Sequence, residues 1–133
     1  EIGWGTASWQ DNATARHWLG ELPEESAPLT VFQWHGETFS LPPGGQPILG
    51  NAFCANQMFA IGPHLAMQCH VEMTPELIGE WCKSWPDEVR GMETLPPCVQ
   101  TPAQMLAEIP ARLPVMRMLA NQLYSAWIKG LKA

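Results

Sequence analysis

The chain has 133 residues, 46% of them hydrophobic and 15% charged, which is the composition of one globular domain with a core and excludes a disordered chain. The formal net charge is −6 and the basic residues form no stripe, which argues against nucleic-acid binding. No apolar run approaches the length that crosses a bilayer, so we expect no membrane association. The four cysteines form no CxxC pair, and we expect reduced thiols in a cytoplasmic protein, although four cysteines also suffice for two disulfides.

Short strands separated by turns are predicted for the first half of the chain. Apolar, β-branched and aromatic runs predict the strands, and clusters of proline and glycine end them. In chain order we expect one or two strands over 1–10, a short helical turn over 11–20 capped by Asp11 or Asn12, an exposed loop over 21–28, a strand over 30–35, a turn at 42–45, short apolar pieces at 47–50 and 52–54, a strand over 57–61 and a buried strand over 65–70.

A helix is predicted directly after these strands. Thr74 suits an N-cap, and Pro75 follows at the first helical position, where its missing N–H costs nothing. The apolar 3–4 spacing continues to Trp85, so we expect the helix to end there, before Pro86. Residues 86–100 are polar and rich in proline, which predicts a connection.

The last part of the chain predicts further helix. Thr101 and Gln104 match a capping box, and Pro110 and Pro114 are expected to break that helix early. From residue 115 an apolar stripe at helical spacing predicts a final helix, with Met116, Leu119, Leu123, Trp127 and Leu131 on its buried face. Strands followed by helical cover indicate an α/β fold, with a sheet partly covered by helices.

His70 and Glu72 lie two residues apart at the end of the strand predicted over 65–70. Residues two apart on an extended backbone project to the same face, so the carboxylate can accept a hydrogen bond from one imidazole nitrogen. That contact would fix the tautomer and leave the other nitrogen to take a proton from a nucleophile. Taken alone, this spacing is more often a histidine that simply bonds to a neighbour at a strand end.

A second cluster, Trp34-His35-Gly36-Glu37, closes the strand predicted over 30–35. The glycine would let a backbone amide approach a ligand closely. Taken alone, this cluster too is more often a strand end with a surface histidine. A metal site built from His35, His70 and Glu72 has little support beyond the ligand types, so we expect no metal and no cofactor.

Together, these motifs resemble class I glutamine amidotransferase domains, and in particular the stand-alone, guanosine-monophosphate-synthase-like members. The resemblance lies in the order of three stretches: Trp-His-Gly-Glu-Thr-Phe with Leu-Pro over 34–42, Asn-Gln-Met-Phe over 56–59, and Met-Gln-Cys-His-Val-Glu with a threonine over 67–74. It covers about residues 1–85, and residues 86–133 match loosely as terminal helices. The resemblance implies a flavodoxin-like α/β sheet with helices, of which residues 1–133 form the C-terminal part of a single domain.

The resemblance also implies an activity, the hydrolysis of the glutamine side-chain amide by a Cys–His–Glu triad. By position, His70 would be the base that activates the cysteine thiol, and Glu72 would orient it. The substrate contacts would come from the stretch Trp34, His35, Gly36 and Glu37. Glutamine would be the small-molecule substrate, and the ammonia would pass to a synthase domain or subunit.

Three features depart from the family pattern. Val71 stands where proline is usual and Glu37 replaces the commoner aspartate, but neither change affects His70 or Glu72. The third is more serious, because the sequence holds no Gly-x-Cys-x-Gly nucleophile elbow. Cys69 adjoins the histidine, but neighbours on a strand point to opposite faces. The resemblance places the elbow upstream of residue 1, so we expect the N-terminal half of the same domain as a partner and an inactive isolated chain.

Three functions therefore compete on sequence grounds. The first is a glutamine amidotransferase or glutaminase fragment. The second is a non-catalytic binding or regulatory module of the same fold, which the missing nucleophile favours. The third is a γ-glutamyl hydrolase-type relative that acts on a peptide or a γ-glutamyl amine. The coding sequence upstream of residue 1 separates the first two, and substrate profiling separates the third.

Overall fold

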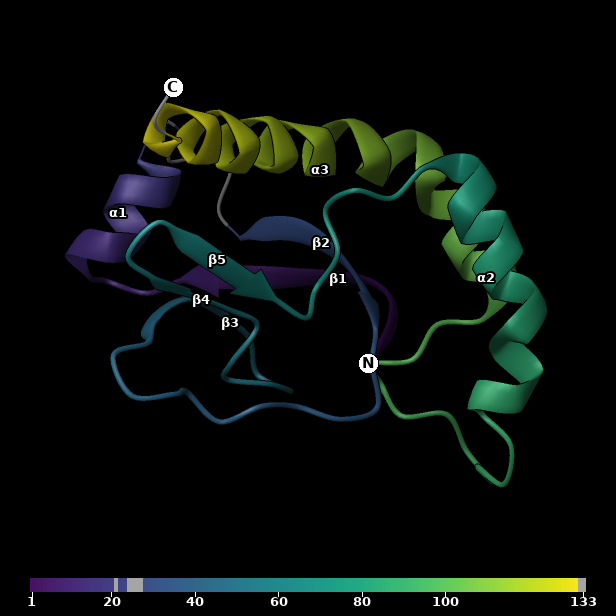
Figure 1. Ribbon diagram of the computed structural model, residues 1–133. Helices are drawn as coiled ribbons and strands as arrows, with labels where there is room; N and C mark the ends of the chain where they lie inside the picture. Colours follow the sequence, from purple (N-terminus) through teal and green to yellow (C-terminus); the bar gives the residue numbers. More distant parts are fainter. Residues whose placement is uncertain (21, 24–27, 132–133) are drawn as a thin grey trace.

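The computed structural model describes residues 1–20, 22–23 and 28–131, and its strands form one five-stranded sheet in the order β2-β1-β3-β4-β5. The elements are β1 (Ile2–Trp9), α1 (Ala13–Leu19), β2 (Leu29–Trp34), β3 (Gln46–Gly50), β4 (Met58–Ile61), β5 (His64–Met67), α2 (Pro75–Glu88) and α3 (Pro102–Gly130). Figure 1 shows α3 running across one side of the sheet, with α1 and α2 near its two ends. Most of the loop predicted over 21–28 lies outside the described residues.

The predicted α/β class is confirmed, but the sheet differs from the flavodoxin-like one that we expected. Each pair of neighbouring strands is antiparallel. Parallel strands need a crossover of a dozen or more residues, whereas β4 and β5 are joined by a turn at Gly62 and Pro63. The parallel sheet of a flavodoxin-like fold is therefore not found among the residues that the structure describes.

Several local predictions are confirmed by the observed caps and strands. The Asn12 side chain accepts a hydrogen bond from the Ala15 N–H at the start of α1. Thr74 caps α2 in the same way, and Thr101 begins α3 with a complete capping box. Strands occur within or close to the ranges predicted around residues 1–10, 30–35 and 57–61. Local side-chain chemistry was sufficient to locate these starts.

The sheet curls, and the segment after β5 returns to its opposite edge. The Gln68 N–H donates to the Gln57 carbonyl at 3.0 Å, beside β4. Two residues later, His70 and Phe32 exchange both backbone hydrogen bonds, at 2.7 and 2.9 Å, so the chain bridges to β2. The buried strand predicted over 65–70 is therefore wrong in extent, because β5 is shorter and half-exposed and the residues after it leave to pair with β2.

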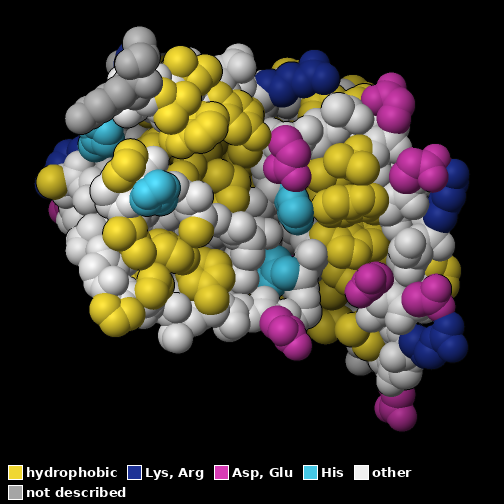
Figure 2. All heavy atoms as spheres, in the orientation of Figure 1, with side chains coloured by type: hydrophobic (Ala, Val, Ile, Leu, Met, Phe, Trp, Pro, Cys, Tyr) yellow, Lys and Arg dark blue, Asp and Glu magenta, His cyan; other side chains and the backbone are white. Residues whose placement is uncertain are grey.

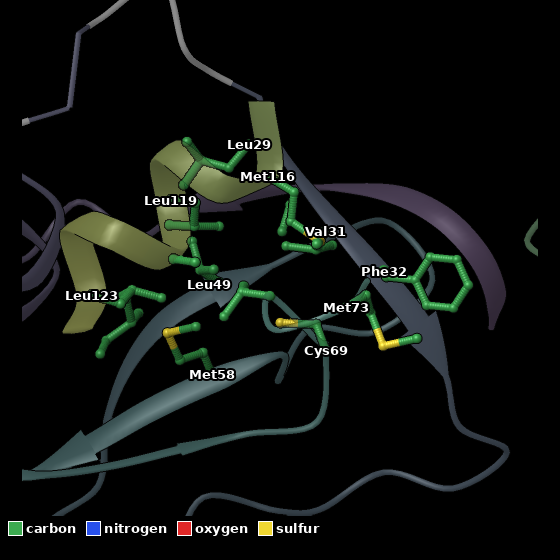
Figure 3. Close-up of a cluster of buried hydrophobic side chains, with 14 of the residues drawn as sticks. Leu29, Val31, Phe32, Leu49, Met58, Cys69, Met73, Met116, Leu119 and Leu123 are labelled. Atoms are coloured by element: carbon green, nitrogen blue, oxygen red, sulfur yellow. The ribbon is translucent and has the colours of Figure 1, made fainter. Parts of the chain in front are cut away.

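The core lies between the curled sheet and α3. In Figure 3, Met116, Leu119 and Leu123 of α3 face side chains of the strands, including Val31 and Leu49. All five of these side chains are buried. Burial of each large apolar side chain contributes about 1.5–3 kcal/mol to stability. The stripe predicted for the last helix is thus confirmed over its first part, although Trp127 and Leu131 further along are exposed.

The predicted break in the last helix is wrong. Helix α3 is continuous over 29 residues and contains both Pro110 and Pro114. An interior proline costs a helix about 3 kcal/mol, but α3 buries six side chains against the rest of the protein, and that burial outweighs two such losses. Both prolines lie on the exposed side, and the helix bends in its first half instead of ending there (Figure 1). No helix among the described residues combines the length and apolar character required to cross a bilayer.

Helix α2 also continues past its predicted end. It includes Pro86 and ends at Glu88. Because this proline lies in the last turn, it removes only one hydrogen bond, the one its N–H would donate to the Cys82 carbonyl. The Val89 N–H then closes the helix by donating to the Trp85 carbonyl at 3.2 Å.

Candidate active site

The two side chains predicted to pair do so. His70 Nδ1 lies 2.7 Å from Glu72 Oε1, and the Val71 N–H donates to Glu72 Oε2 at 3.0 Å. An ionised carboxylate can only accept hydrogen bonds, so Nδ1 carries the proton of the neutral imidazole. The opposite nitrogen, Nε2, is then the one available to accept a proton. A histidine held in this way can act chemically as a general base.

Backbone and aromatic contacts hold the histidine in place. The bridge to Phe32 fixes the backbone of His70, and the indole of Trp81 from α2 packs edge-on against its ring, with centroids 4.9 Å apart. Trp81 also packs against Trp34, at 5.5 Å. In the sequence, Trp81 is simply one of the apolar residues at 3–4 spacing in the helix predicted after Thr74. Its position two turns after the Thr74 cap is the signal that could have placed it beside the motif.

The hydrogen bond from His70 keeps Glu72 ionised. This bond lowers the pKa of the Glu72 carboxyl below 4.5, and it outweighs the opposing effect of partial burial. The carboxylate is 45% exposed and the imidazole 27% exposed, so solvent screens their attraction. Figure 2 shows histidine and acidic side chains along the middle of the visible face, between two apolar areas.

A pH-dependent contribution to stability follows from this lowered pKa. Because the folded-state pKa lies below the unfolded one, the stabilisation is present above pH 4.5 and is lost as pH falls through the folded-state value. Glu72→Gln should therefore lower the free energy of unfolding near neutral pH, by no more than about 1 kcal/mol. Urea unfolding near neutrality and well below pH 4.5 measures the difference, with Glu88→Gln, an exposed glutamate, as the control. A penalty that stays constant over this range would contradict the assignment.

The four predicted substrate contacts are divided between two places. His35, Gly36 and Glu37 line a cavity of about 370 Å³ together with Cys54 and Cys98. The lining of that cavity includes neither member of the His–Glu pair.

Trp34 is turned away from the other predicted contacts, against Trp81 on α2. Directly paired residues share a face of a sheet, so the His70 ring lies on the face of Phe32 and Trp34. His35 is one residue further on and faces the other way.

The ring of His35 is held by its own neighbours. Its Nδ1 lies 2.9 Å from the Glu37 carbonyl, and its Nε2 lies 3.4 Å from Glu1 Oε2, in a contact that lacks hydrogen-bond alignment. The Glu1 carboxylate is 6% exposed and accepts hydrogen bonds from Asn51 and Gln57, at 2.8 and 2.7 Å. These contacts brace the turn that follows β2. In the part of the chain that the structure describes, no three histidine, cysteine or acidic side chains are grouped to hold a metal ion.

Cys69 is placed where a nucleophile cannot act. Its side chain is 1% exposed and lies in the core (Figure 3), with Sγ 3.8 Å from the Gln57 carbonyl. Burial raises the pKa of the Cys69 thiol to about 12. The expectation that it faces away from His70 is met, because the imidazole packs outward against Trp81.

We expect Cys69 to resist alkylation in the folded protein. Its raised pKa lowers the thiolate fraction on the order of 10³-fold relative to an ordinary thiol, and burial further blocks the reagent. Peptide mapping by mass spectrometry after a timed iodoacetamide reaction would compare it with Cys98, which is half-exposed. Both should react equally after denaturation. Labelling of the two thiols at similar rates in the folded state would show that Cys69 is accessible.

Comparison with known structures identifies close relatives of this fold. A glutamine amidotransferase from Methylobacillus flagellatus matches with a TM-score of 0.84 and 39% identity, over 99% of this chain and 53% of that one. A glutamine amidotransferase from Thermotoga maritima matches with a TM-score of 0.74 and 26% identity, over 97% of this chain and 51% of that one. A third structure matches with a TM-score of 0.75 and 25% identity. No family model and no curated protein matches the sequence.

The chain thus spans about half the length of the structures that it matches. The match nevertheless extends over nearly all of its own residues, including the two motif-bearing segments around His35 and His70. By fold and sequence identity together, the chain is a partial domain of the class I glutamine amidotransferase family.

Proposed function

We propose that the chain supplies the general base and its orienting carboxylate for hydrolysis of the glutamine side-chain amide, and that polypeptide outside residues 1–133 supplies the thiol. The observation that carries this proposal is the 2.7 Å contact between His70 Nδ1 and Glu72 Oε1. It directs Nε2 away from the carboxylate, and the side chain is open enough to meet a group from another segment.

In the proposed reaction, His70 Nε2 takes the proton from the cysteine thiol as the sulfur attacks the amide carbon of glutamine. Glu72 stabilises the imidazolium that forms, and Trp81 covers one side of the ring. The imidazolium then gives its proton to the departing nitrogen, which leaves as ammonia. His70 Nε2 then deprotonates a water molecule, which hydrolyses the thioester and releases glutamate and the free thiol.

Within the predicted stretch from Trp34 to Glu37, Gly36 and Glu37 are best suited to touch the substrate. A Cβ at Gly36 would meet nothing within 4 Å, so its backbone is open on that side. Glu37 is exposed beside it. The Trp34 side chain packs against Trp81, and the His35 ring lies beside the Glu1 carboxylate. These contacts suit both side chains to holding the turn in place.

The proposal is tested by expressing the complete reading frame that contains this chain and assaying glutamate release from glutamine. We expect an upstream Gly-x-Cys-x-Gly elbow after a strand, and glutaminase activity that is lost when that cysteine is replaced by alanine. Activity from residues 1–133 alone would contradict the division of the triad. Glutamate release compared with release from γ-glutamyl peptides and γ-glutamyl amines separates the amidotransferase from the γ-glutamyl hydrolase alternative.

The second candidate is a non-catalytic module of the same fold. It is favoured by the absence of the elbow from this sequence and by the burial of Cys69, the cysteine next to the histidine. A complete reading frame without the elbow, whose product binds glutamine in calorimetry but releases no glutamate, would support this function over the first.

A further inference from the structure

One edge of β1 is open over its middle. On one side β1 pairs with β2 from Ile2 to Ala7. On the other side it pairs with β3 only at Ser8 and Trp9, and with the segment 98–100 only at Ile2. Between these ends, β1 has no strand partner within the described ranges. The backbone groups that point to this edge belong to alternate residues, Trp4 and Thr6.

Side chains substitute for a strand along this edge. The Trp4 N–H donates to Gln100 Oε1 at 2.7 Å. The Thr6 carbonyl accepts a long hydrogen bond from Asn51 Nδ2 at 3.3 Å. The same Nδ2 also donates to the Glu1 carboxylate. Gln100 and Asn51 therefore each satisfy one backbone group of this edge, and they do not replace the continuous row of hydrogen bonds that a neighbouring strand would make. An unpaired edge of this kind is a template for another extended segment.

Gln33 gives an independent indication of a missing partner. It is opposite Gly3 in the register, is 1% exposed, and neither its Oε1 nor its Nε2 has a hydrogen-bond partner. A buried carboxamide without partners is unfavourable, because desolvation of both polar atoms is uncompensated. The group that would satisfy it must offer both a donor and an acceptor, as a peptide group does.

The open edge and the unpartnered amide meet in one cavity of about 290 Å³. Gly3 and Gly5 leave its floor without side chains, and the methylene chain of Gln33 crosses close to Gly5, with Cγ 3.3 Å from where a Cβ would lie. One turn of an α-helix, about 10–12 Å across with its side chains, needs more than this volume, whereas a short extended backbone needs less. The cavity therefore selects for a short extended segment of small residues.

We infer that this cavity is the seat of an extended segment from the rest of the domain, which pairs with the open edge of β1 and hydrogen-bonds the carboxamide of Gln33. The inference rests on the part of the proposed function that places further polypeptide outside this chain. The matched structures support that occupant, because the chain accounts for 53%, 51% and 52% of their lengths. The expected occupant is a segment encoded in the same reading frame.

Hydrogen exchange at Thr6 tests the pairing. Amide exchange is measured on the 133-residue chain and on the product of the complete reading frame. The Thr6 N–H should exchange at least about 100-fold more slowly in the complete protein, because the added segment closes the edge. Equal exchange in the two proteins would mean that water fills the cavity, and would overturn the inference. So would a reading frame that encodes nothing beyond these 133 residues.

Gln33→Met provides the second measurement, since methionine keeps the length of the side chain and removes both polar atoms. In the 133-residue chain we expect the melting temperature to stay the same or rise, because an unpartnered amide is removed. In the complete protein we expect it to fall by about 4 °C, because bonds to the added segment are lost. Gln122→Met, at an amide on α3 that bonds to the Trp18 carbonyl, is the control and should act alike in both proteins.

If Gln33→Met shifts the melting temperature in the same direction in both proteins, the inference is wrong. This result is distinct from a failure of the proposed function. If the Thr6 N–H exchanges fast in a complete protein that still releases glutamate, only the inference of a docked segment is wrong. If the Thr6 N–H is protected in a complete protein without glutaminase activity, only the catalytic assignment is wrong.

Discussion

His70→Ala should lower glutamate release by the complete protein about 10²–10⁴-fold, because it removes the proposed general base, which would generate the thiolate. The effect should appear in kcat more than in KM, since the imidazole is proposed to act on the nucleophile and not to bind glutamine. Steady-state assays of glutamate release, with circular dichroism to check folding, measure it. The 2.7 Å pairing with Glu72 is the structural reason for expecting so large a loss.

The matched control is His64→Ala, the same substitution at an exposed histidine that begins β5. It should leave kcat and KM within about twofold of the parent, as expected for a surface position remote from a site. Full activity in the His70→Ala protein would remove the catalytic assignment. Equal losses in both variants would attribute the effect to folding instead of catalysis.

Phe32→Ala is the substitution for which we expect the largest loss of stability. Phe32 is fully buried, packs edge-on against Trp4 at 5.1 Å, and lies near Trp34 and Trp81. Its removal should lower the free energy of unfolding by about 3–5 kcal/mol, the transfer and cavity terms of a buried aromatic ring. That is a large fraction of the about 5–15 kcal/mol that stabilises a domain. Urea unfolding followed by tryptophan fluorescence measures the change.

Phe53→Ala is its control, because Phe53 is 59% exposed. The same atoms are deleted, but little burial is lost, and the change should stay within about 0.5 kcal/mol. Similar penalties at the two positions would mean that the aromatic cluster is not the core around which β2 packs.

The sequence was most informative where one residue determines its neighbour's conformation. The caps at Asn12, Thr74 and Thr101 are local hydrogen bonds, and each could be predicted from residue type and spacing. The contact of His70 with Glu72 could be predicted for the same reason, since two residues on extended backbone share a face.

Long-range geometry was beyond those arguments. The bridge between Phe32 and His70 joins residues far apart in sequence, and no periodicity encodes it. The position of Trp81 beside the histidine depends on how α2 packs on β2, which the helical spacing does not specify. Pro110 was misread because propensity was weighed without the burial that α3 gains along the sheet.

The division of the Trp34–Glu37 stretch shows the same limit at close range. Consecutive residues were treated as one site, but the backbone at the end of β2 sends Trp34 toward α2 and His35 toward Glu1. The alternation of a strand was known, yet which face would meet which neighbour depended on the curl of the sheet. That curl is a property of the whole fold.

The return of the chain from β5 to β2 has a consequence for how the proposed activity would be lost on heating. Residue 70 is both the proposed base and the residue whose backbone hydrogen bonds join the segment after β5 to β2. The backbone of residue 70 cannot move away without breaking its two hydrogen bonds to β2, and β2 cannot separate from the sheet at this point while those bonds hold. Inactivation and melting should therefore be one cooperative event, with no folded but catalytically silent species between them.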